Sequence, residues 1–208
     1  MGPLQSPEAR RRLARRARVL AWGGIAWHFV EFAIALAAGI AASSIALIGF
    51  GADSLIESAA GLVVIWRFGS SRFDSQDAER RAQQLIAVTF FVLAAYVAAE
   101  ATRTLVGGTH PEASWVGIGL AAFTAPTMPL LALAKRGVGN RLGSAATVQE
   151  GMQNMVCAYL SIALLIGLLA NAVLGWWWAD PLAALVIAAV AVREGRESWR
   201  GEGCCDGR

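Results

Sequence analysis

The chain has 208 residues, of which 56% are hydrophobic and only 16% are charged. Its positive mean hydropathy, +0.51, excludes an ordinary soluble domain. The formal net charge of +3 comes from arginines that flank apolar runs, so it is explained by membrane orientation and gives no support for nucleic-acid binding.

Six apolar runs predict six membrane-spanning helices, because crossing the hydrocarbon core takes about 20 residues. Such long, non-alternating runs can satisfy their backbone groups in lipid only as helices, which excludes a β-barrel. The expected fold class is therefore all-α, a polytopic membrane protein built as a bundle of six transmembrane helices. In chain order the predicted spans are residues 19–42, 45–66, 85–106, 115–133, 144–169 and 176–192.

The first span follows a basic segment, residues 1–18, which we expect to be cytoplasmic. The apolar run is about twice the roughly 7–15 residues of a signal peptide, so we expect a retained span and no cleavage. It contains Glu31, with His28 one turn earlier. Glu31 is a candidate fifth metal ligand or proton-relay carboxylate. His28 alone is more typical of a hydrogen-bonded interior residue.

The second span carries the most informative pair of residues, Asp53 and Glu57. A spacing of four places both carboxylates on one helix face. Each charge at the centre of a bilayer costs roughly 2.5–3.5 kcal/mol, so the pair needs compensation. A bound cation, a proton or both would supply it.

The third and fourth spans have simpler interpretations. Glu100 lies one turn before Arg103, which predicts an ion pair at the outer interface. Pro126 and Pro129 fall inside the fourth span and predict a bend there. Lys135 is expected to follow the end of this span on the cytoplasmic side.

The fifth span repeats the pattern of the second, because Glu150 and Asn154 are again four residues apart. If the second and fifth helices face each other, two such pairs offer four ligands to one divalent ion. Carboxylates gathered in this way would also share protons, so metal and H⁺ would compete for the site. Separate packing roles for the two pairs are the alternative. Cys157 is expected to be a small packing residue.

The sixth span opens on three tryptophans, followed by Asp180 and Pro181, which predicts that Asp180 caps this helix. Residues 193–208 form a short tail, in which Cys204 and Cys205 are either unremarkable thiols or a capture site for a soft ion. Seventeen of the eighteen basic residues fall on one side of the predicted topology, and Arg103 alone falls on the other. Both termini are therefore expected in the cytoplasm, with residues 19–192 forming the transport domain.

Three motifs occur at the positions where these spans begin or carry acidic residues. They are Ser44-Ile45-Ala46-Leu47 ahead of Asp53-x-x-x-Glu57, then Glu150-x-x-x-Asn154, then Trp178-Ala179-Asp180-Pro181-Leu182-Ala183-Ala184.

With these motifs the chain resembles the transmembrane domain of the cation diffusion facilitator family of divalent-metal exporters. The resemblance implies export of a divalent metal in exchange for protons, with Asp53, Glu57, Glu150 and Asn154 as ligands. Zinc is slightly favoured, and manganese or iron are the alternatives. Members usually carry His or Asp at the position of Glu150 and Asp at that of Asn154. They also usually carry a cytoplasmic domain after the sixth span. We expect this chain to lack that domain, so a homodimer is expected to form through transmembrane helices.

The expected location is the bacterial inner membrane, with lipids and divalent cations as partners and no enzymatic activity. A non-transporting membrane protein that binds metal or a partner is the alternative function. An intramembrane hydrolase is disfavoured, because Ser54 and Ser58 have no histidine nearby in sequence and no nucleophile motif.

Overall fold

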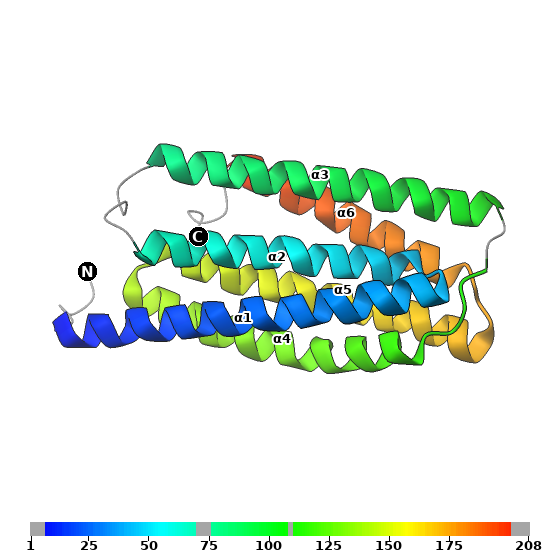
Figure 1. The fold of residues 1–208 in the computed structure, drawn as a ribbon, viewed down its shortest axis with the longest axis horizontal. Helices are drawn as coiled ribbons and strands as arrows, with labels where there is room; N and C mark the ends of the chain where they lie inside the picture. Colours follow the sequence, from blue (N-terminus) through cyan, green and yellow to red (C-terminus); the bar gives the residue numbers. More distant parts are fainter. Residues whose placement is uncertain (1–6, 70–75, 108–109, 201–208) are drawn as a thin grey trace.

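Six helices make up nearly all of the described part of the computed structural model, which comprises residues 7–69, 76–107 and 110–200 (Figure 1). No strand occurs within these ranges. The predicted all-α membrane bundle is therefore confirmed. The helices are α1 (Pro7–Ala42), α2 (Ile45–Gly69), α3 (Gln76–Gly107), α4 (Trp115–Leu142), α5 (Ala145–Leu174) and α6 (Ala179–Arg200).

Four stretches of these helices are apolar enough to cross a membrane on length and composition alone. The helices α2 and α6 have 25 and 22 residues. At about 1.5 Å per residue, both exceed the roughly 30 Å of the hydrocarbon core. The four apolar stretches are Arg11–Ala42, Ala87–Gly107, Trp115–Leu142 and Glu150–Leu174.

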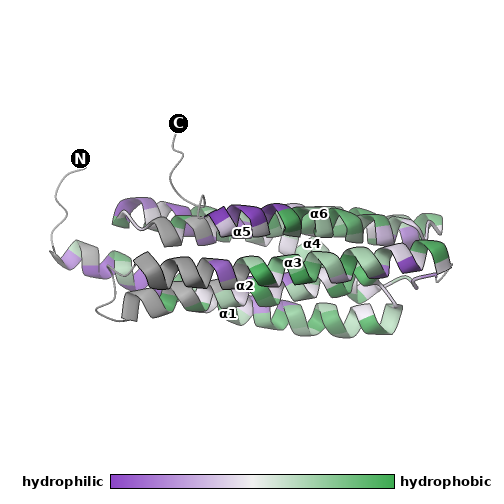
Figure 2. Ribbon diagram, turned by 90° about the horizontal axis from the view of Figure 1, so that it is seen from above, coloured by the Kyte–Doolittle hydropathy of each residue, from purple (hydrophilic) through white to green (hydrophobic). Residues whose placement is uncertain are grey.

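Several helices continue beyond the predicted spans at the end expected in the cytoplasm. α1 begins at Pro7, α4 ends at Leu142 and α6 ends at Arg200. Arginine ends a hydropathy run but is a good helix former, so the helix outlasts the apolar stretch. Hydrophilic residues accordingly gather toward the end of the bundle where α1 begins and α6 ends (Figure 2).

The helices associate most extensively as three pairs, α1 with α2, α4 with α5 and α3 with α6. The first two pairs join through contacts between α1 and α4 and between α2 and α5, which makes a four-helix group. The α3–α6 pair lies along one side of this group (Figure 1).

Glycines allow α4 and α5 to approach at backbone distance. A Cβ at Gly151 would lie 2.7 Å from Cγ of Arg136 and 2.9 Å from the carbonyl oxygen of Ala132. The turn between the helices is also well capped. Ser144 accepts a hydrogen bond from the Thr147 amide, and Gly143 adopts a left-handed φ of 63°. Close small-residue packing of this kind is typical of membrane helices.

The prediction that Asp180 caps its own helix is wrong. Asp180 lies in the first turn of α6, fully buried, and its carboxylate accepts hydrogen bonds from the start of α2. The donors are the Ser44 hydroxyl and, at 3.4 Å, the Ala46 amide. Ser44 itself accepts from the Leu47 amide at 3.2 Å. A carboxylate is favourable at any helix N-terminus, and here the neighbouring helix supplies it.

Two smaller expectations concern α3 and α4. Arg103 donates to Glu100 at 2.7 Å, which confirms the predicted ion pair between exposed side chains. α4 continues as a single helix through Pro126 and Pro129.

Candidate metal centre

The α2 acids point into the four-helix group and toward α5. Asp53 and Glu57 are 5% and 7% exposed. Their carboxylates and the thiol of Cys157 on α5 form a group whose ligand atoms all lie within 4.8 Å of one another. The i,i+4 spacing thus produces a shared buried face, and α5 does lie opposite it.

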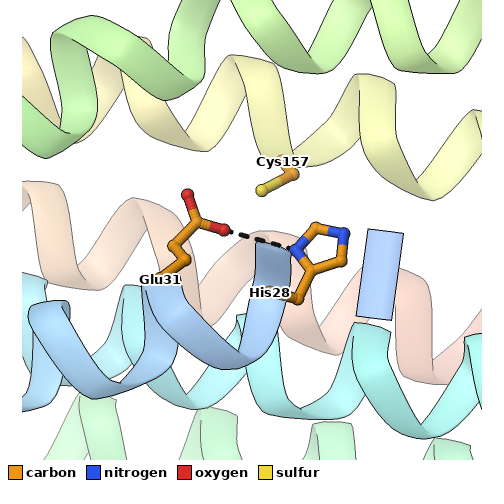
Figure 3. A group of neighbouring side chains, drawn as sticks. All are labelled: His28, Glu31 and Cys157. Atoms are coloured by element: carbon orange, nitrogen blue, oxygen red, sulfur yellow. Dashed lines mark hydrogen bonds and ion pairs between the residues drawn. The ribbon is translucent and has the colours of Figure 1, made fainter. Parts of the chain in front are cut away.

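A second group of possible ligands involves α1 and the same cysteine. His28 and Glu31 are both buried, and Nδ1 of His28 lies 3.3 Å from Oε2 of Glu31. With the Cys157 thiol, their ligand atoms again lie within 4.8 Å of one another. Figure 3 shows the cysteine reaching from α5 toward the two α1 side chains.

The two groups form one continuous polar cluster. Nδ1 of His28 also lies 3.2 Å from Oε2 of Glu57, which connects α1 with α2. On the other side of the ring, Nδ2 of Asn154 lies 3.0 Å from Nε2 of His28. The imidazole is therefore held between α2 and α5, with Nδ1 facing the carboxylates.

Glu31 has partners that the sequence did not reveal. Ser54 on α2 donates to Oε2 of Glu31 at 2.9 Å, and Thr124 on α4 donates to Oε1 at 2.5 Å. Hydrogen bonds to an ionised carboxylate are among the stronger ones in proteins. They fix the orientation of a side chain that is fully buried.

Glu150 has a separate counter-ion, the buried side chain of Lys135. Nζ of Lys135 lies 2.7 Å from Oε1 of Glu150, and the two side chains are 1% and 7% exposed. Lys135, which the sequence places just after the fourth predicted span, lies on the buried inner face of α4, which continues to Leu142. Neither three-residue group contains Glu150, so the structure brings the predicted ligands Asp53 and Glu57 together without it.

Two glycines make room for this ion pair. A Cβ at Gly24 of α1 would lie 2.8 Å from Nζ of Lys135, and a Cβ at Gly61 of α2 would lie 3.5 Å from Oε1 of Glu150. All four helices of the group therefore meet around the pair. Gly24 and Gly61 each lie one turn from His28 and Glu57, so the pair adjoins the cluster.

Some buried acceptor atoms lack a hydrogen-bond donor within the described part of the chain. They include Oε2 of Glu57, Oε2 of Glu150 and Oδ1 of Asn154. Buried acceptors are normally satisfied, and unsatisfied ones are costly. Oε2 of Glu57 lies 3.2 Å from Nδ1 of His28, and the Asn154 amide contacts the other ring nitrogen, so two of these acceptors border the imidazole in the polar cluster.

Sequence reasoning missed Lys135 and gave little weight to Cys157 and His28. The spacing of residues in the fourth span could have revealed Lys135, because residues three or four positions apart lie on one helix face. The buried residues of α4 follow this pattern and include Thr124, Met128, Ala132, Lys135 and Gly139.

The fold defines a polytopic integral membrane protein, and buried ionisable groups inside such a bundle are typical of proteins that move ions. Residues 22–200 match the cation efflux transmembrane domain, so the chain belongs to the cation efflux family. This confirms the resemblance found in the sequence and makes metal-cation efflux transport its general function. No curated protein matches the chain.

Proposed function

We propose that the protein is a secondary transporter that exports a divalent metal cation from the cytoplasm in exchange for protons. The observation that supports this most is the buried pair of α2 carboxylates beside a third carboxylate, Glu31. Within the described residues, only the imidazole of His28 makes an ion-pair contact with this group. A mobile cation would supply the positive charge that the protein does not.

Exchange with protons follows from the same charge. When the metal leaves, carboxylates in a low-dielectric bundle cannot all remain ionised, so protons would replace it. When the metal returns, its ligands must lose those protons. Alternating exposure of the site to the two sides would then couple the two fluxes.

The proposed ligands are Asp53, Glu57 and Glu31, joined by the two α5 residues of the predicted set. Glu150 and Asn154 would contribute Oε2 and Oδ1, which have no hydrogen-bond donor among the described residues. An oxygen set of this kind accepts manganese or iron as well as zinc. The nitrogen and sulfur donors alongside favour zinc slightly.

We also propose that the protein lies in the inner membrane of a bacterium, as a homodimer formed through transmembrane helices.

The test of transport uses the full chain in proteoliposomes with an imposed pH gradient. Zn²⁺ or Mn²⁺ uptake is expected to depend on the gradient and to disappear in Asp53→Ala. Glu100→Gln is the matched control, because Glu100 is paired with Arg103 at the surface. Uptake that is unchanged in Asp53→Ala would exclude the proposed site.

The Lys135–Glu150 pair favours one other function, a membrane protein that binds metal without moving it. A lysine bound to one of the predicted ligands removes that ligand from the metal. Equilibrium binding of Zn²⁺ to the purified protein, together with no uptake under any pH gradient, would support this second function.

A further inference from the structure

We propose that the protein has a second metal position, formed by His28, Glu31 and Cys157, beside the α2 carboxylates. This inference rests on the proposed function and deepens it. Its donors are an imidazole nitrogen, a carboxylate oxygen and a thiolate sulfur. This mixed set fits a borderline or soft divalent cation, zinc or cadmium, better than manganese or magnesium.

The geometry of the α1 residues matches that of two ligands on one metal. In a tetrahedral zinc site with bonds of about 2.0–2.3 Å, neighbouring ligand atoms lie roughly 3.3–3.8 Å apart. Nδ1 of His28 and Oε2 of Glu31 are 3.3 Å apart. The Cys157 thiol lies within 4.8 Å of both, so a small adjustment of its side chain completes three of the four positions (Figure 3).

A carboxylate oxygen without a hydrogen-bond donor in the described part of the chain, Oε2 of Glu57, borders this position. Oxygens of two carboxylates, Glu31 and Glu57, both approach the same ring nitrogen, at 3.3 and 3.2 Å. A single ring nitrogen carries at most one proton, so it cannot satisfy both. Oε2 of Glu57 accordingly has no hydrogen-bond donor in the described part of the chain, although the residue is only 7% exposed.

Cys157 belongs to both groups and is fully buried. An ion that moved from Asp53 and Glu57 toward His28 would keep Glu31 and the Cys157 sulfur within reach, while it exchanged the α2 carboxylates for the imidazole. Binding requires the thiolate, so the thiol proton leaves as the metal–sulfur bond forms. The cysteine thus favours soft cations and lies within reach of an ion at either position.

Cadmium is the direct probe of this site, because a cadmium–thiolate bond has a charge-transfer absorption in the ultraviolet. Cys204 and Cys205 lie outside the described residues, so the experiment uses Cys204→Ser/Cys205→Ser, in which Cys157 is the remaining thiol. Titration of this purified full-length variant with Cd²⁺ is expected to give a saturable band. Adding Cys157→Ser should abolish the band, and His28→Gln should weaken Cd²⁺ affinity tenfold or more.

Saturating Cd²⁺ binding, shown by equilibrium dialysis, without a charge-transfer band would overturn the second position. Unchanged affinity in His28→Gln would do so as well, and this variant provides the test if Cys157→Ser fails to fold. Transport is measured separately. Asp53-dependent zinc uptake without the band would leave the proposed function standing, whereas a band that depends on His28, without uptake, would refute transport and retain the site.

Discussion

Two buried charged regions lie side by side in this bundle and differ in how their charge is balanced. Glu150 has a lysine ammonium at 2.7 Å, and that pair is neutral by itself. Glu57 and Glu31 share the imidazole of His28, and the group that they form with Asp53 has hydroxyl or thiol neighbours in Ser54, Thr124 and Cys157. The comparison teaches that a fixed internal cation suits a structural contact, whereas an unbalanced carboxylate group is suited to cations that come and go.

The largest effect is expected from Glu57→Gln, which removes one charge from the unbalanced group. Glu57 contacts His28 and belongs to the α2 ligand group, so zinc uptake should fall about 100-fold or more. Proteoliposome uptake under a fixed pH gradient measures this. Glu100→Gln should retain full uptake, and equal losses in both variants would show that the effect is not specific to the cluster.

Lys135→Met tests the contribution of the Lys135–Glu150 ion pair to stability. It leaves Glu150 buried without its counter-ion, and breaking a buried pair typically costs about 3–5 kcal/mol. We expect a large drop in the thermal unfolding temperature of the detergent-solubilised protein.

The double variant Lys135→Met/Glu150→Gln should recover most of that stability, because no unpaired charge remains. Its zinc uptake then distinguishes two roles of Glu150. Full uptake would show that the pair is only structural. Lost uptake with recovered stability would show that Glu150 is also a metal ligand.

Thr124→Val is expected to have an intermediate effect. It removes the α4 hydroxyl that donates to Glu31, and a hydrogen bond to a charged group is worth about 1.5–3 kcal/mol. Thr127→Val is the matched control, because the Thr127 hydroxyl donates only to the Phe123 carbonyl of its own helix among the described contacts. Thermal unfolding of both variants, with and without Zn²⁺, measures the difference. Similar losses would argue against a special role for the Glu31 contact.

Glu194→Gln should produce the smallest change in stability, since Glu194 lies beyond the apolar part of α6. Burial, and secondarily Glu197, raises its pKa from an ordinary 4.5 to about 7, although Arg193 opposes the rise. A raised carboxyl pKa means that ionisation destabilises the folded state, so stability is lost as pH rises from about 4.5 to 7. The variant should therefore be more stable than the parent at pH 8, by about 1 kcal/mol or less, and similar at pH 4.5. Unfolding temperatures at the two pH values test this sign.

The sequence predicted the fold well because apolar length alone requires helices in lipid. It also predicted the shared face of Asp53 and Glu57, since that depends only on helical spacing. It did not predict that Lys135 balances Glu150 or that Asp180 caps α2, because both contacts join separate helices. His28 and Cys157 were undervalued for the same reason. Their contacts join α1, α2 and α5, and such contacts cannot be read from the sequence of any one helix.

The contact between Asp180 and the start of α2 has a mechanical consequence. It fastens α6, and with it the α3–α6 pair, to the four-helix group at the end expected outside the cell. Breaking that buried carboxylate contact would be costly. In the transport cycle proposed above, we therefore expect the two parts to pivot near this end and to move apart most at the cytoplasmic ends of the helices.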